Sequence, residues 1–136
     1  MTNKEKKELL LDELKSTSDL EIYQKTSDLE RFSKDFFDYS PILINELKNC
    51  LADIVVRPLS VDAIIVVAQI CNKYSTPLTL RGSGTGNYGQ CVPLHRGVVM
   101  VMSALKKIRN FDSKSGEITV ESGCLLRDIN DELIKH

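Results

Sequence analysis

The sequence predicts an α+β fold in which a βαβ unit contributes to a small mixed sheet flanked by helices. Three observations support this prediction: a β-branched run at 52–57, an apolar stretch of helical length at 61–73, and a second short strand at 76–80. Two strands joined by a crossover helix run parallel, with a right-handed connection. At 136 residues the chain is long enough to form one hydrophobic core.

The first fifty residues have weaker signals, and we expect them to form a helical and irregular extension. Residues 4–15 mix strong helix formers with a leucine cluster, which predicts an amphipathic helix. A short helix is expected around 27–32, followed by a loop through 35–41. The aromatic residues here are expected to anchor the segment on the core, with a cofactor-facing wall as the alternative; they are Phe32, Phe36, Phe37 and Tyr39.

From residue 52 onward the signals are stronger. The strand at 52–57 is expected to end before Pro58, and Ser60 is placed to cap the helix that follows. The remaining expected elements are strands at 97–102, 108–111 and 117–121, a turn at 112–116 between the last two, and a helix from 125 to about 135.

Composition excludes several classes of function. Lys plus Arg number 18 and Asp plus Glu 19, so the net charge is -1, whereas nucleic-acid-binding domains usually have a basic surplus. The four cysteines form no C-x-x-C pair and have no histidine at ligand spacing, which argues against a zinc site. The start MTNKEKKELLLDELK is too charged for a signal peptide, and no apolar run approaches membrane-spanning length. We therefore expect a cytoplasmic location.

Residues 81–90, RGSGTGNYGQ, contain four glycines and a G-x-G-x-x-G spacing. A Rossmann unit needs a helix directly after these glycines, but here Pro93 and then a strand follow. A Walker A loop would end in G-K-[ST], and a kinase glycine loop needs a lysine in the next strand; both lysines are missing. Two interpretations remain: a tight loop without a ligand, and an anion-binding nest of backbone N–H groups.

These residues resemble the flavoproteins with a vanillyl-alcohol-oxidase-type (PCMH-type) FAD-binding domain. More narrowly, they resemble the branch of FAD-containing dehydrogenases that includes glycolate oxidase subunits and D-lactate dehydrogenases. The resemblance covers roughly residues 52–135, and Arg96 departs from it where the family has a glycine. Its motifs, in consistent order, are Val56-Arg57-Pro58, Pro77, the 81–90 loop, Gly97-Val98-Val99, Ser103 through Lys107-Ile108, and Val120-Glu121-Ser122-Gly123.

The resemblance implies the N-terminal lobe of such a domain at residues 51–136, with 1–50 as its extension. It implies a loop that wraps the pyrophosphate of FAD with backbone amides. Family members with covalent flavin have a histidine where this chain has Thr85, so non-covalent FAD is implied. His95 is expected at the surface and Cys91 in packing, neither as a flavin attachment. The candidate cofactor-binding residues are Arg81, Gly82, Ser83, Gly84, Thr85, Gly86, Gly89 and Gln90.

Two functions follow from the resemblance. In the first, the chain is the FAD-binding portion of an oxidoreductase that oxidises a 2-hydroxy acid or related alcohol, a small-molecule substrate, by hydride transfer to the flavin. The alternative is a truncated lobe without turnover that acts as a binding or interaction module. The family's substrate residues lie in later segments, so no catalytic residue is assigned. The chain alone is expected to be inactive, to bind FAD weakly or not at all, and to self-associate through an exposed sheet edge.

Overall fold

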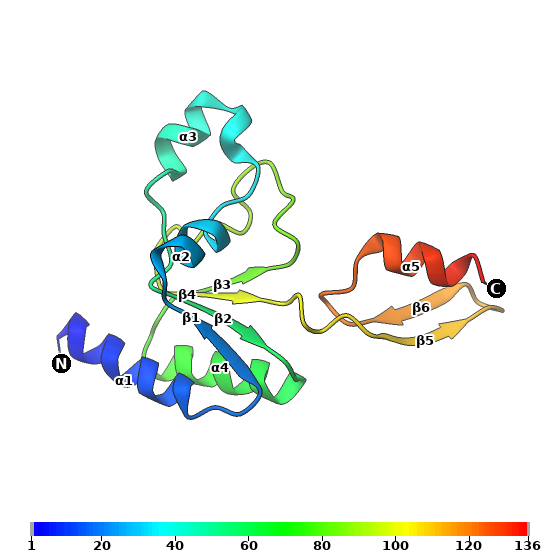
Figure 1. The fold of residues 1–136 in the computed structure, drawn as a ribbon, viewed down its shortest axis with the longest axis horizontal. Helices are drawn as coiled ribbons and strands as arrows, with labels where there is room; N and C mark the ends of the chain where they lie inside the picture. Colours follow the sequence, from blue (N-terminus) through cyan, green and yellow to red (C-terminus); the bar gives the residue numbers. More distant parts are fainter. Residues whose placement is uncertain (1, 136) are drawn as a thin grey trace.

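The computed structural model describes residues 2–135, which form a larger and a smaller lobe joined by an extended segment (Figure 1). No helix in this range is long and apolar enough to cross a lipid bilayer. In chain order the elements are α1 (Asn3–Lys15), β1 (Leu20–Tyr23), α2 (Thr26–Phe32), a 3-10 helix (Phe37–Tyr39), α3 (Pro41–Leu47), β2 (Ile54–Pro58), α4 (Val61–Lys73), β3 (Leu78–Arg81), β4 (Val98–Val101), β5 (Ile108–Asp112), β6 (Glu117–Val120) and α5 (Leu126–Leu133).

The predicted βαβ unit is confirmed, with a third strand between its two strands. The sheet of the larger lobe has the order β1-β2-β4-β3, and both β2 and β3 run parallel to β4. Val99 of β4 pairs with Val55 on one side and with Thr79 on the other. All of β4 is buried, as expected for a central parallel strand. Helix α4 has the predicted bounds, and the Ser60 hydroxyl caps it by accepting the N–H of Ala63.

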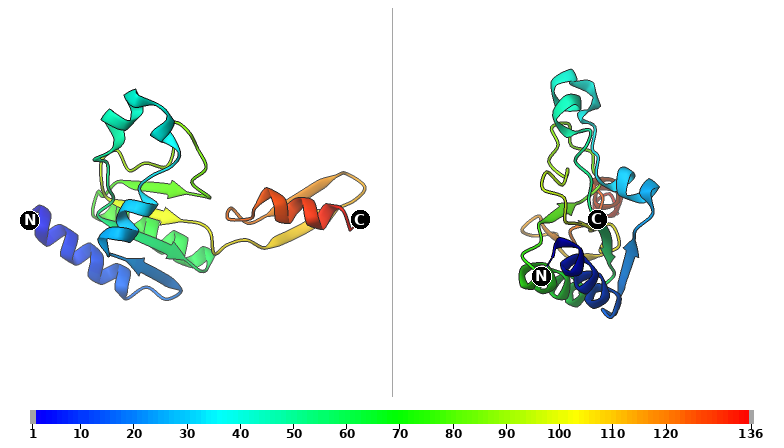
Figure 2. Two further views of the ribbon diagram at one scale, coloured as in Figure 1. Left: turned by 45° about the horizontal axis from the view of Figure 1, so that its top comes forward. Right: turned by 90° about the vertical axis from the view of Figure 1, so that its left-hand side faces the viewer.

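Helices cover both faces of this sheet (Figure 2). Alternate residues of a strand point to opposite sides, so each face has apolar side chains for a helix to cover. On one face, Leu10 and Leu14 of α1 are buried with α4, which confirms the predicted amphipathic helix. The strand residues in this cluster are Ile54, Val56, Val98 and Met100. On the opposite face, α2 packs on a second cluster of Ala52, Val55, Val99 and Val101.

Strand β1 was not predicted from the sequence. It extends the sheet antiparallel to β2, from Leu20 opposite Pro58 to Tyr23 opposite Val55. The Arg57 guanidinium donates to both carboxylate oxygens of Glu21, at 2.8 and 2.7 Å, and thereby lowers the pKa of Glu21. The predicted end of β2 before Pro58 is wrong by one residue, since a proline is tolerated at the last position of a strand.

A third, smaller core lies outside the sheet, where the residues between α2 and β2 meet the connection from β3 to β4. Phe37, Leu47 and Val92 are buried together, with Leu43, Ile44 and Cys50 packed around them. The predicted loop at 35–41 is wrong in part, because it contains the 3-10 helix and the first residue of α3. Ser40 caps α3 and Pro41 occupies its first position, where a proline needs no N–H partner.

The aromatic residues of this region divide into two pairs. Phe37 is buried and Phe32 packs against the sheet, as expected of anchors. Phe36 and Tyr39 are instead 62% and 60% exposed. The anchoring prediction is therefore correct for one pair and wrong for the other.

The smaller lobe consists of the β5–β6 hairpin with α5 beside it (Figure 1). Gly123 joins it to the larger lobe, because its N–H donates to the carbonyl of Leu105 at 2.7 Å. A Cβ on Gly123 would lie 2.1 Å from the carbonyl oxygen of Met102. Glu121 accepts the N–H of Lys107 at 2.7 Å. The V-E-x-G motif thus holds the hairpin against the segment that leaves β4.

Just before β4, the backbone at Gly97 packs tightly against the segments that lead into the neighbouring strands β2 and β3. The φ of Gly97 is +78°, and a Cβ there would lie 2.2 Å from the carbonyl oxygen of Pro77. Asp53 donates its N–H to the Gly97 carbonyl at 2.8 Å and accepts the Gly97 N–H at 3.0 Å. Arg96, the departure from the family pattern, has a φ of +61°, a conformation that glycine adopts without strain.

Replacing Gly97 by alanine should lower the free energy of unfolding by about 3 kcal/mol or more, since the contact with Pro77 adds to the strain of a positive φ. Gly116 is the matched control, because its φ is +74° but no atom lies within 4 Å of a Cβ placed there. Gly116→Ala should cost only about 1 kcal/mol. Urea unfolding followed by circular dichroism measures both losses. Equal losses of stability in the two variants would show that the contact between position 97 and Pro77 adds no strain.

Candidate functional site

The glycine loop lies in the connection between β3 and β4, two neighbouring parallel strands. Such strands need a crossover connection, usually a helix, because the chain must return to the other end of the sheet. Here residues 82–97 make the return without a helix or strand (Figure 1). The loop leaves the carboxyl end of β3, the edge at which open α/β sheets bind ligands. The predicted strand–loop–strand arrangement is therefore confirmed.

The loop backbone presents a run of unused hydrogen-bond donors. Within residues 2–135, the N–H groups of 83–87 donate to no acceptor, whereas the next N–H, of Tyr88, donates to Gln90 Oε1 at 3.1 Å. Ser83 and Thr85 are exposed. Gly84 has a φ of +71°, and such a residue among ordinary ones turns successive N–H groups toward one side. An anion-binding nest would require such a run of free donors.

Arg81 supports the loop from behind. Its Nη1 donates to the carbonyl oxygens of Phe32, at 3.3 Å, and Lys34, and contacts the Cys91 sulfur at 3.1 Å. Its Nη2 packs under Gly84, where a Cβ would lie 2.0 Å away. The guanidinium therefore ties the end of α2 to the loop. Its positive charge lies close behind the backbone that would face an anion.

Two further glycines of the loop, Gly86 and Gly89, lie close to Asp35 and Leu47. A Cβ on Gly86 would lie 2.3 Å from Gln90 Oε1 and 3.2 Å from Asp35 Oδ2. A Cβ on Gly89, whose φ is +80°, would lie 2.6 Å from Leu47 Cδ1. The glycines thus allow the loop to approach the N-terminal segment closely, in addition to making turns.

Seven of the eight predicted cofactor-binding residues lie in the connection between β3 and β4, and Arg81 is the last residue of β3; together they occupy three different settings. Gly82, Ser83 and Thr85 are exposed; Gly84, Gly86, Gly89 and Arg81 contact the chain behind the loop; and Gln90 accepts a loop N–H. Their roles toward a cofactor stay predictions. Sequence reasoning did not include Asp35, because a single acid in a polar segment carries no pattern.

The cysteines and His95 lie where a packing and a surface role were expected. All four cysteines are free thiols, and Cys91 is buried beside Arg81. Burial raises the pKa of Cys91, and it raises the pKa of Cys71 to about 11. His95 is exposed near the amino end of β4. Within residues 2–135 no group of three or more His, Cys, Asp or Glu is placed to hold a metal ion.

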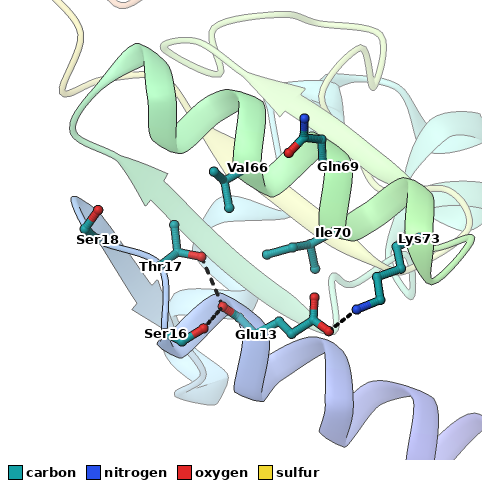
Figure 3. A pocket seen from close by; sticks show the side chains of 8 residues that line it. All are labelled: Glu13, Ser16, Thr17, Ser18, Val66, Gln69, Ile70 and Lys73. Atoms are coloured by element: carbon teal, nitrogen blue, oxygen red, sulfur yellow. Dashed lines mark hydrogen bonds and ion pairs between the residues drawn. The ribbon is translucent and has the colours of Figure 1, made fainter.

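Two pockets lie away from the loop. One, of about 630 Å³, lies between α1 and α4, where Glu13 pairs with Lys73 across the pocket (Figure 3). The other, of about 480 Å³, lies at the amino ends of β2 and β4. Its ionisable lining residues are Lys4, Lys6, Lys7, His95, Arg96 and Asp53. Lys7 and Arg96 both pair with Asp53, at 3.1 and 3.0 Å, so part of this positive charge is already neutralised.

A comparison with known domain families shows to which family these residues belong. Residues 52–136 match the family described as FAD binding domain. The chain belongs to this family. The resemblance inferred from the motifs is therefore confirmed, and FAD is the cofactor of the family.

Similar proteins agree with this assignment. A D-lactate dehydrogenase of Anaerostipes hadrus is 29% identical over 77 residues, which are 57% of this chain and 16% of the relative. The glycolate oxidase subunit GlcD of Escherichia coli K12 is 30% identical over 70 residues, which are 52% of this chain and 14% of the relative. The chain thus matches only a small part of these proteins. A solved structure of p-cresol methylhydroxylase superposes on 99% of this chain and 25% of its own, with a TM-score of 0.78 and 15% identity, which confirms the predicted fold.

Replacing Arg81 by lysine should lower the free energy of unfolding by about 1–3 kcal/mol in the absence of any ligand. The carbonyl oxygens of Phe32 and Lys34 would lose the donor that they share, and an ammonium group cannot replace the planar fork. Arg109→Lys is the control, because this exposed guanidinium pairs only with Glu121 and its replacement should cost less than about 1 kcal/mol. Thermal or urea unfolding measures both. An Arg81→Lys variant as stable as the wild type would show that the hydrogen bonds of Arg81 to the end of α2 do not stabilise the fold.

Proposed function

We propose that the glycine loop binds the pyrophosphate of FAD through several of the backbone N–H groups of residues 83–87. The observation that supports this proposal is the run of unpaired N–H groups in a chain that belongs to the FAD binding domain family. A diphosphate ester carries two negative charges, which several backbone donors stabilise without a helix dipole. Arg81, behind the loop, adds a positive charge. The residues present fit the group.

We propose further that the flavin is held without a covalent bond. Thr85 occupies the loop position at which covalent members of the resembling family have a histidine, and its side chain is exposed. His95 lies at the amino end of β4, whereas the loop leaves the carboxyl end of β3. Bound FAD would supply the hydride-accepting chemistry. The residues of this chain would bind and orient its pyrophosphate.

We infer that the chain is the FAD-binding portion of an oxidoreductase that oxidises a 2-hydroxy acid or related alcohol. The D-lactate dehydrogenase and glycolate oxidase names of its relatives support this class of substrate. A stand-alone binding module without turnover is the alternative. The family match from residue 52 supports the proposed boundary between extension and lobe. Self-association and a cytoplasmic location stay predictions.

Gly82 offers a variant that tests the loop without disturbing the free chain. No atom lies within 4 Å of a Cβ placed at Gly82, so the free loop has open space where a side chain would leave the backbone. Next to a diphosphate held by the N–H groups that follow, the same side chain would occupy the space of the ligand. We therefore expect Gly82→Val to keep the wild-type melting temperature. Its affinity for FAD should fall at least about tenfold, which is about 1.4 kcal/mol.

Equilibrium dialysis against FAD at up to millimolar concentration measures this change even if wild-type binding is weak. Ser113→Val, in the exposed turn between β5 and β6, is the control and should bind FAD as the wild type does. Acid precipitation of the loaded protein should release all of the flavin into the supernatant. If Gly82→Val and the wild type bind FAD with equal affinity, the loop is not part of the cofactor site. Flavin that stays with the precipitated protein would contradict non-covalent binding.

A further inference from the structure

The segment just before the family match lies directly against the glycine loop. Phe36 donates its N–H to the carbonyl of Gly86 at 2.8 Å, and the carbonyls of Phe32 and Lys34 accept from Arg81. The small core of Phe37, Leu47 and Val92 continues this contact beneath the end of the loop. The loop therefore rests on residues that lie outside the matched region, which begins at residue 52.

Asp35 is the buried acid at this contact. Only 6% of its surface is exposed. Its Oδ1 accepts the N–H of Phe37 at 3.1 Å, but its Oδ2 is buried and has no hydrogen-bond partner within residues 2–135. Burying a carboxylate oxygen without a donor is unfavourable, and such a group in a native fold needs an explanation.

The unpaired oxygen lies close to the backbone of a residue whose N–H group is also unpaired. Asp35 Oδ2 would lie 3.2 Å from a Cβ on Gly86, and the N–H groups of Gly86 and Asn87 have no acceptor within residues 2–135. A glycine lets the adjoining peptide groups rotate with little steric cost. A small rotation of the backbone at Gly86 is therefore the simplest way to bring a donor to this oxygen.

We propose that Asp35 is a positioning residue for cofactor binding, which acts through the loop. When the pyrophosphate of FAD binds, the backbone at Gly86 turns so that the N–H of Gly86 or Asn87 donates to Asp35 Oδ2. The hydrogen bond holds the remaining N–H groups of the nest toward the ligand. This inference rests on the function proposed above, and it adds a residue that lies outside the family match.

The charges of the site are compatible with this role. Arg81 and Asp35 both lie near the Cys91 thiol, so the guanidinium offsets the carboxylate behind the loop. A carboxylate that accepts an N–H also orders the peptide that carries it, since a charge-assisted hydrogen bond is stronger than one between neutral groups. The loop is thus held from behind by one cation and one anion.

Asp35→Asn separates this role from a purely structural one. The amide keeps the size of the side chain and an oxygen for the N–H of Phe37, but it places an NH2 group where Oδ2 was. Two donors then face each other in the loaded state. We expect the free variant to melt at the wild-type temperature or above, because an unpaired buried charge is gone, and the dissociation constant for FAD to rise at least about tenfold. Asp38→Asn is the control, because it removes the same charge from an exposed position nearby.

Two measurements decide the proposal: equilibrium dialysis against FAD and amide hydrogen exchange of Gly86 and Asn87. In the wild type, FAD should slow exchange at one of these two amides at least about tenfold, and this slowing should be absent in Asp35→Asn. If the wild type binds no FAD at millimolar concentration, the proposed function is wrong and the inference fails with it. If the wild type binds and Asp35→Asn binds equally well, Asp35 has no such role while the proposed function stands. Unchanged exchange at both amides in FAD-loaded wild type would overturn the role of Asp35 whether or not the variant folds.

Discussion

The return of the chain from β3 to β4 is the constraint on which the site depends. These strands are parallel neighbours, so the chain must travel back along the sheet between them. A helix in this position would satisfy its own backbone, but residues 82–97 form none. Their N–H groups therefore stay available at the start of the connection, and Gly97 fits the chain against Pro77 at its end. The donors that suit an anion are a direct consequence of this irregular crossover.

An irregular connection needs support that a helix would supply itself. Here the N-terminal segment provides this support. Arg81 donates to the carbonyls of Phe32 and Lys34. The small core around Phe37 and the approach of Asp35 to Gly86 add further contacts. The extension is separate from the matched domain in sequence, yet it adds β1 to the sheet and α1 to the core. The glycine loop and its support thus come from two distant parts of the chain.

Local signals in the sequence were enough to predict much of this fold. The helix at 61–73 has a serine cap and an apolar length that no strand reaches, so its bounds were predicted correctly. Strand β1 was missed because its four residues are all half-buried at a sheet edge and show no alternation. Helix α3 was missed although Ser40 and Pro41 form a recognisable start, because the helix is only seven residues long.

The glycine loop was predicted from its motif, but its support was not. Asp35 reaches Gly86 only through the tertiary fold, and no periodicity or spacing in the sequence joins two positions so far apart. The glycines likewise indicated that another part of the chain lies close to the backbone, but not which part. The neighbours are Arg81 for Gly84, Leu47 for Gly89 and Pro77 for Gly97. Sequence patterns identify residues that need space or a special backbone conformation, and the fold determines which neighbour imposes that need.

Chemical-shift mapping of the 15N-labelled chain during titration with FAD tests the central claim most directly. The account predicts the largest changes at the amides of residues 83–87, a second set at 35–37, and little change around the pocket lined by Lys4, Lys7 and Arg96. That pocket is the competing place for an anion, since it is positively charged and lies at the amino ends of β2 and β4. Largest changes at the lysine-lined pocket, with the loop unaffected, would contradict the assignment of the glycine loop as the cofactor site.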